Sequence, residues 1–173
     1  AWSAGGGGML VLTETRVGWI DRSLQLQWTI DFDNPVLDVA TAPFGNVVAV
    51  SLGNGETHVF NSSQRRIGSF RTMTPLRFLE LVASRQRIVG ASDSGLLCAH
   101  DIGGSLRWKQ TIWSNIGGLA TDGNGRTILL ASFNHGIQCF NGAGRSRGFY
   151  NLGGTVSRVA INYTGEQIRS EEH

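Results

Sequence analysis

The sequence predicts an all-β protein, a β-propeller of four-stranded antiparallel blades with four blades per chain. Three observations predict it: an internal repeat of 40 residues, a turn-rich composition with 24 glycines, and the absence of helical periodicity in any stretch of ten residues. Twisted four-stranded sheets of about 40 residues, repeated in tandem, pack face to face around an axis, and this is how propellers are built.

The repeat is seen first in the residues that close each short apolar run, because a polar side chain favours a turn there. Other columns keep apolar or small residues at the same spacing, with Glu80 as the one exception in a column of alanines. So many columns in phase are hard to produce by chance. The columns are Asp21, Asn61, Asp101 and Asn141; Val36, Leu76, Ile116 and Val156; Val39, Leu79, Leu119 and Val159; and Ala40, Ala120 and Ala160.

Within one repeat the pattern predicts four strands. In the second repeat these are 36–41, 46–51, 56–61 and 66–71, joined by turns that contain Gly, Asn, Asp or Ser.

The repeat also predicts how the chain is divided. Residues 1–8 form a flexible Gly-rich start, residues 9–168 form the propeller, and residues 169–173 form a tail. The propeller has four times 40 residues, so we expect the carboxyl end to supply the innermost strand of a blade and the amino end its three outer strands. Such a shared blade removes exposed strand edges.

Ring closure has three alternatives at this point. The preferred hypothesis is a homodimer that shares strands between its chains and forms an eight-bladed ring. The others are a single four-bladed ring and a fragment of a longer propeller chain.

Residues 36–40 (VLDVA), Gly45 and residues 48–51 (VAVS) resemble a WD-repeat blade, and the likeness covers nearly the whole chain. Residues 95–101 leading into 104–108 are similar to blades of pyrroloquinoline-quinone-type propellers. The Trp-Asp dipeptide of WD repeats is absent. The resemblance therefore implies the propeller superfamily, and it brings no single family's function with it.

Composition narrows the partners. Charged residues make up 16% of the chain, against roughly 25% in an average globular domain, and the net charge is only +2 with scattered arginines. We therefore expect no nucleic-acid partner. No membrane partner is expected either, because no apolar run approaches the ~18 residues that span a bilayer. Cys98 and Cys139 form neither a CxxC motif nor a His-Cys cluster, so they are expected to be free thiols. A cytoplasmic location is expected, with a mature secreted form as the alternative.

The candidate binding residues lie in the loops between blades and in the second hairpin turns, which we expect on one face. These loops differ between repeats while the strands keep their type, and divergent loops on a repeated scaffold carry specificity. Trp113 stands out as a large contact residue, although it would also fit as a plug of the channel. The candidates are Asp33, Asn34, Arg71, Thr72, Trp113, Asn115, Asn134 and His135.

No catalytic, metal or cofactor site is predicted. His58, His100 and His135 are not paired with a nucleophile, and Asp31 with Asp33 fits turn capping better than calcium binding. Gly5–Gly8 lacks the following helix and Lys-Ser/Thr of a phosphate loop. Trp28 and Trp108 fit packing between blades better than cofactor stacking.

The sequence therefore predicts a non-catalytic platform that recognises a protein or peptide through its loop face. Two alternatives are a small-ligand or redox propeller with a site in the central channel, and half of a propeller that belongs to a larger multidomain protein.

Overall fold

A computed structural model describes residue 1 and residues 7–172 of the chain. These residues form five antiparallel sheets, numbered here in chain order, and one 3-10 helix, Ala83–Arg85. Sheet 1 has β1 (Gly8–Thr13), β2 (Arg16–Ile20) and β3 (Leu26–Asp31). Sheet 2 has β4 (Val36–Thr41), β5 (Val47–Leu52), β6 (Glu56–Asn61) and β7 (Arg66–Arg71). Sheet 3 has β8 (Phe78–Val82), β9 (Arg87–Ala91), β10 (Leu96–Asp101) and β11 (Leu106–Thr111). Sheet 4 has β12 (Ile116–Thr121), β13 (Thr127–Ser132), β14 (Gly136–Asn141) and β15 (Ser146–Tyr150), and sheet 5 has β16 (Val156–Ile161) and β17 (Ile168–Glu172).

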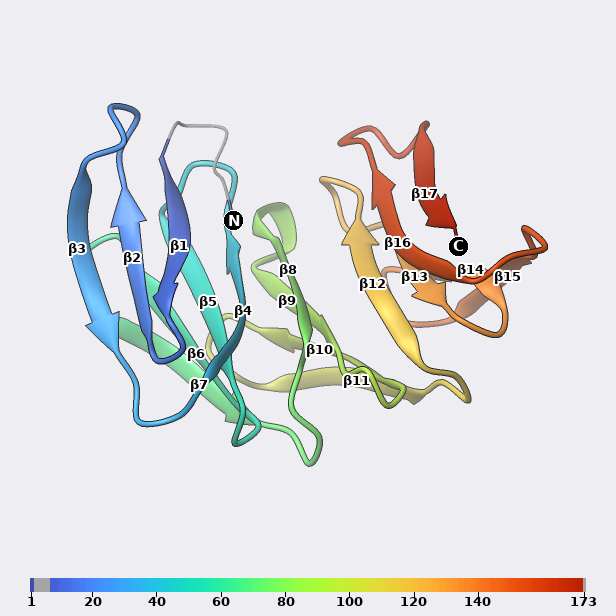
Figure 1. Cartoon of the computed structure of the whole chain (residues 1–173), viewed down its shortest axis with the longest axis horizontal. Coiled ribbons are helices and arrows are strands. Elements are labelled where there is room, and N and C mark those ends of the chain that lie inside the picture. The colour runs from blue at the N-terminus through green and yellow to red at the C-terminus, as the bar shows by residue number, and fades with distance from the viewer. Residues whose placement is uncertain (2–6, 173) are drawn as a thin grey trace.

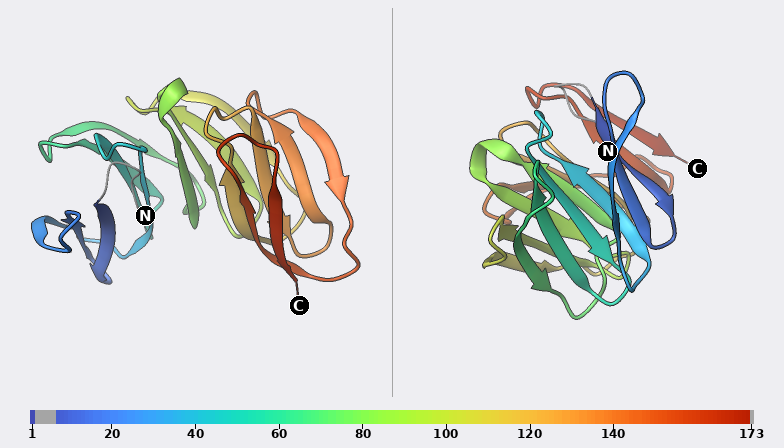
Figure 2. Two further views of the ribbon diagram at one scale, coloured as in Figure 1. Left: turned by 90° about the horizontal axis from the view of Figure 1, so that it is seen from above. Right: turned by 90° about the vertical axis from the view of Figure 1, so that its left-hand side faces the viewer.

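The sheets follow one another as an open arc, with each sheet facing the next (Figures 1 and 2). An apolar layer fills each of the four contacts between neighbouring sheets. Alternate residues of one strand serve two different layers, as Val48 packs toward sheet 1 and Ala49 packs toward sheet 3. The predicted all-β propeller class and its four-stranded blades are confirmed.

The polar column at the end of the third strand works as the sequence predicts. Asn141 Oδ1 accepts hydrogen bonds from the backbone N–H groups of Ala143 and Arg145, both at 3.0 Å. This side chain thereby fixes the tight turn that leads into β15. The same pair of bonds recurs at Asp21 and Asn61, and Asp101 accepts the second of them, from the N–H of Ser105.

The first and last sheets are incomplete, and both lack the strands that the repeat would add. Among the described residues, sheet 1 has no inner strand and sheet 5 has no outer strands, while β1 and β17 both occupy the second-strand position of the repeat. β16 pairs with β17, and at the other end Ala1 exchanges two backbone hydrogen bonds of 2.9 Å with Met9 of β1. Within the described residues of one chain, the two ends therefore do not share a blade.

The chain boundaries differ from the predicted ones at both ends. β17 continues to Glu172, past the boundary predicted at residue 168, because these residues repeat the second-strand positions of sheet 4. Gly8 already belongs to β1. The rest of the predicted flexible start falls mainly on residues 2–6, which lie outside the described residues.

Candidate functional site: three grooves between neighbouring sheets

The same groove occurs three times along the arc, between the outer strand of one sheet and the third strand of the next. Groove 1 lies between β3 and β6, groove 2 between β7 and β10, and groove 3 between β11 and β14. Their volumes are about 350, 330 and 310 Å³. Because the grooves follow the 40-residue repeat, equivalent positions line them with different side chains.

Backbone hydrogen bonds hold the loops that form the groove rims. The N–H of Thr72, after β7, donates to the carbonyl of Gly55 at 3.0 Å, and the N–H of Ile112 donates to Gly95 at 2.7 Å. Gly55 and Gly95 have φ of 87° and 100°, and a Cβ at Gly95 would collide with the carbonyl of Ile112. Each inter-sheet loop is therefore fixed to the second hairpin turn of its own sheet, so loops and turns lie on one edge as predicted.

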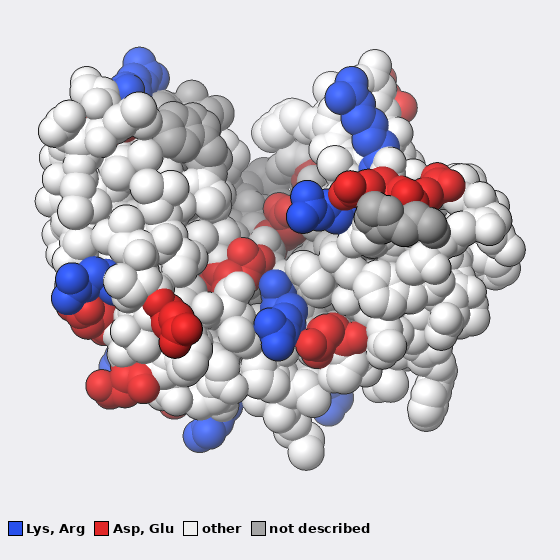
Figure 3. All heavy atoms as spheres, viewed as in Figure 1, with Lys and Arg blue, Asp and Glu red and all other residues white. Residues whose placement is uncertain are grey.

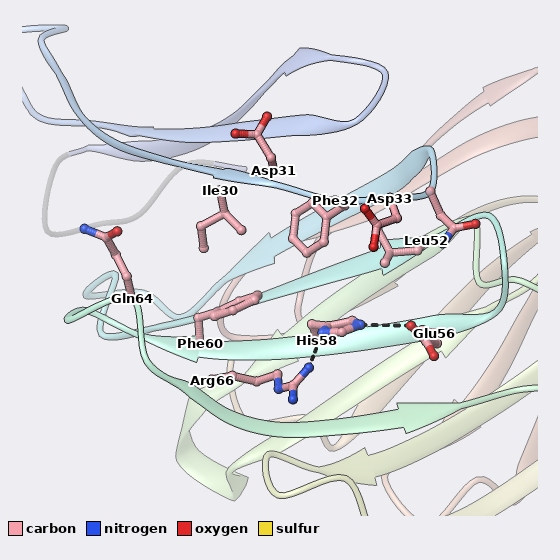
Figure 4. Close-up of a pocket in the computed structure, with 11 residues that line it drawn as sticks. Ile30, Asp31, Phe32, Asp33, Leu52, Glu56, His58, Phe60, Gln64 and Arg66 are labelled. Carbon is pink, nitrogen blue, oxygen red and sulfur yellow. Dashed lines mark hydrogen bonds and ion pairs between the residues drawn. The ribbon is translucent and has the colours of Figure 1, made fainter.

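Groove 1 contains a hydrogen-bonded row of charged and polar side chains (Figure 4). Arg66 Nη1 lies 3.3 Å from His58 Nδ1, and His58 Nε2 lies 3.2 Å from a carboxylate oxygen of Glu56. Since a guanidinium only donates, Nδ1 accepts and the ring proton is on Nε2. The bond from His58 lowers the pKa of Glu56. Phe32 covers His58 edge-on at a centroid distance of 5.8 Å.

Groove 2 contains a buried histidine where the other two grooves have phenylalanine. His100 takes the position of Phe60 and Phe140 in the repeat, is 5% exposed, and stacks on Phe70 with ring centroids 3.7 Å apart. Burial lowers its pKa to about 4, so the ring is neutral at pH 7. Its Nδ1 is buried and has no hydrogen-bond partner among the described residues.

Groove 3 is lined by Trp113, His135 and Phe140. Trp113 is 88% exposed, so it does not plug the channel, which was the alternative role considered for it.

The eight candidate residues are divided among the grooves. Asp33 and Asn34 line groove 1, Arg71 and Thr72 line groove 2, and Trp113 and His135 line groove 3. Asn115 and Asn134 are exposed beside groove 3, where Asn115 accepts the N–H of Phe133 at 3.1 Å and Asn134 donates to Ser114 Oγ at 3.4 Å. Arg71 and Trp113 therefore line two different grooves.

Sequence reasoning missed the groove walls that come from third and fourth strands. These residues are Glu56, His58, Arg66, His100 and Lys109. The available signal was strand alternation. Every second residue of β6 and β10 faces the preceding sheet, so these positions of the 40-residue repeat form one wall of each groove.

The inner strands line a hollow that contains two carboxyl groups. Asp38 accepts the N–H of Val39 at 2.8 Å and of Leu79, on the next sheet, at 2.7 Å. Burial raises the pKa of Asp38, and burial together with Asp38 raises the pKa of Glu80 to about 7. Figure 3 shows acidic side chains inside the hollow, while charges of both signs are interspersed on the rest of this face. The described lining contains no histidine.

The tryptophans and cysteines are the remaining side chains considered as possible cofactor or redox residues. Trp108 packs in the layer between sheets 3 and 4 and donates its Nε1–H to the carbonyl of Gly142 at 3.1 Å, while Trp28 stacks on Trp19. Cys98 and Cys139 are free thiols. Over the described part of the chain, no group of three or more His, Cys, Asp or Glu residues is arranged to hold a metal ion. The same residues include no helix with the length and hydropathy needed to cross a bilayer.

Comparison with known proteins decides the fold. The chain superposes on a chain of a crystal structure of the mitotic checkpoint complex with a TM-score of 0.83 at 19% sequence identity, covering 99% of this chain and 55% of that one. The fold is that of a WD-repeat-like β-propeller. No protein-family model matches the sequence, and no curated protein does. This chain thus spans about half the length of the chain that it resembles.

Proposed function

We propose that this WD-repeat-like propeller is a non-catalytic platform that recognises a protein or peptide through its three grooves. The observation that carries the proposal is the recurrence of one groove on a fixed backbone with a different set of side chains each time. Clefts with an apolar floor and a few placed polar groups are how proteins hold ligands. An exposed indole such as that of Trp113 supplies large contact area at low entropic cost.

A peptide-display selection against the purified chain tests this function. Enriched peptides should bind the variant with Trp113→Ala and Arg71→Ala at least about tenfold more weakly, since these side chains are groove contacts. Stability should change by less than about 1 kcal/mol, because exposed loop residues contribute little to folding. The matched control is Phe44→Ala, which removes an exposed aromatic ring from the hairpin turn at the opposite edge.

Three outcomes would contradict the proposal. They are a selection that enriches no binding peptide, peptides that are sensitive to Phe44→Ala and insensitive to the double substitution, and a loss of several kcal/mol of stability in the double variant. The last result would assign Trp113 to the core.

We further propose that a second copy of the chain completes the ring, with β16 of one copy pairing with β1 of the other. The support is that sheet 1 has no inner strand among the described residues and β16 is an inner strand. The edge of β1 now pairs with Ala1, and the edge of β16 pairs with the exposed strand β17. Side-chain contacts between β16 and β17 include the Arg158–Glu171 ion pair of 3.5 Å and a 3.2 Å hydrogen bond from Ser157 Oγ to the carbonyl of Glu171, and exposed ion pairs of this kind are worth little. The homodimer would be an eight-bladed ring with a solution mass near twice 18.7 kDa.

A further inference from the structure

Groove 2 differs from the other grooves in its charge. Its lining has two cations, Arg71 and Lys109, and no carboxylate, whereas Asp33 and Glu56 line groove 1. Lys109 lies opposite Cys98 in the β10–β11 register, so its side chain is on the same face of sheet 3 as the groove floor. Among the described residues, Lys109 forms no ion pair. Arg71 stands only at the rim of groove 2: it lies opposite Glu56 in the β6–β7 register, so its side chain is on the face of sheet 2 that bears Glu56, and its charge helps to lower the pKa of Glu56.

The same groove combines these cations with accessible apolar surface. Leu96 and the buried Cys98 form its floor, while the half-exposed Leu106 and the fully exposed Met73 stand at its sides. An unbranched thioether adapts to many shapes of ligand, and an exposed leucine beside a groove gains free energy when it is covered. The groove therefore favours a ligand with apolar side chains as well as negative charge.

His100 adds an observation that is independent of the surface charges. This side chain is more than nine-tenths buried in the lining of groove 2, and its Nδ1 has no partner among the described residues, although a phenylalanine fills this position in the two neighbouring grooves. A buried nitrogen without a partner is unfavourable, so a ligand that supplies the missing hydrogen bond would gain free energy at this position.

We propose that groove 2 binds an acidic peptide segment, whose apolar side chains lie between sheets 2 and 3 while a carboxylate of the segment contacts Lys109. The inference rests on the proposed recognition function and specifies which groove acts and which chemistry it selects. Charge complementarity selects the partner, because an unpaired lysine over a floor without carboxylates favours an anionic chain and disfavours a basic one.

Fluorescence anisotropy with two labelled peptides of equal length tests the proposal. One peptide alternates leucine with glutamate and the other alternates leucine with lysine. The chain should bind the glutamate peptide more tightly, and Lys109→Glu should weaken that binding by roughly tenfold. Higher salt should weaken it further, since the contacts are exposed to solvent ions. Arg126→Glu is the matched control, because it makes the same change of charge at an exposed arginine in the β12–β13 turn and should leave the affinity unchanged.

Three results would overturn the inference: equal binding of both peptides, tighter binding of the lysine peptide, and equal losses in the Lys109 and Arg126 variants. If peptides from the display selection bind but are insensitive to Lys109→Glu, the recognition function stands and the assignment of groove 2 fails. If no peptide binds at all, the recognition function itself fails. A thermal melt of each variant identifies any loss that comes from unfolding, and Lys109→Ala provides a second test of the same groove.

Discussion

A single histidine in groove 2 changes the chemistry of a position that packs phenylalanine in the neighbouring sheets. His100 stacks on Phe70 as the equivalent phenylalanine would, but its ring also contains nitrogens that need hydrogen-bond partners. The buried Nδ1 has none among the described residues. Burial lowers the pKa of His100 to about 4, against 6.5 for the exposed side chain. The folded chain therefore resists protonation at this site over the whole interval between these values.

His100→Phe should stabilise the protein, and by more at acidic pH. At pH 7 removal of the unpaired Nδ1 should add about 1 kcal/mol. As pH falls from 6.5 toward 4, the unfolded chain binds a proton that the folded chain does not, so the parent protein loses stability, by up to about 3 kcal/mol, while the variant does not. Urea unfolding at pH 7 and pH 5 measures the difference, with an expected extra gain of about 2 kcal/mol at pH 5.

A gain that is the same at pH 7 and pH 5 would contradict the buried neutral state of His100. A large loss of stability at pH 7 would mean that a ring nitrogen makes a stabilising bond.

At the scale of strands and sheets, a close approach of backbones marks the contact between sheets 2 and 3. Gly68 on β7 faces the turn after β10, and a Cβ at this position would collide with the carbonyl of Ile102 and with Gly103. Both obstacles are backbone atoms, which cannot move aside as the end of a flexible side chain does. Sheets 2 and 3 therefore require glycine at this contact.

Gly68→Ala should destabilise the protein by about 2 kcal/mol or more, because sheets 2 and 3 would have to separate or shift to relieve the overlap. Gly53→Ala is the matched control, since the nearest atoms to a Cβ at Gly53 lie at an ordinary 3.6 Å. Thermal or urea unfolding of both variants provides the comparison. Equal midpoints for the two would show that the contact at Gly68 is loose.

The strands and turns could be predicted because they depend on local pattern. Alternation and the turn residues Asp21, Asn61, Asp101 and Asn141 place the four strands of the second repeat to within one residue, and the 40-residue period gives the order of the blades. β17 was missed because its exposed residues, Ile168–Glu172, carry no alternating apolar pattern, so only the backbone pairing with β16 identifies it.

The grooves could be predicted only in part because they form between sheets. The rim loops with Arg71 and Trp113 were found from their divergence between repeats. The walls at His58, His100 and Lys109 depend on which face of a sheet each position occupies and on the sheet packed against it. Glu80 was visible as an exception in its column, but its environment in the hollow was not.

At the scale of the whole molecule, the ends of the arc present the faces that interior sheets bury. Leu10 and Leu12 on β1 are 38% and 40% exposed, whereas the equivalent residues of β5, Val50 and Leu52, are 0% and 2% exposed. At the other end, Tyr150 on β15 is exposed where its equivalent Phe70 stacks on His100. Apolar faces of this kind at both ends of an arc favour association with a matching arc.

The central claim is that this arc is half of a ring and that a second copy of the chain completes it. The grooves of the completed ring are then the recognition platform. Light scattering coupled to size exclusion, performed at several protein concentrations, tests it most directly. The account predicts a mass of twice 18.7 kDa that persists on dilution. A mass of 18.7 kDa at every concentration would contradict completion by a second copy.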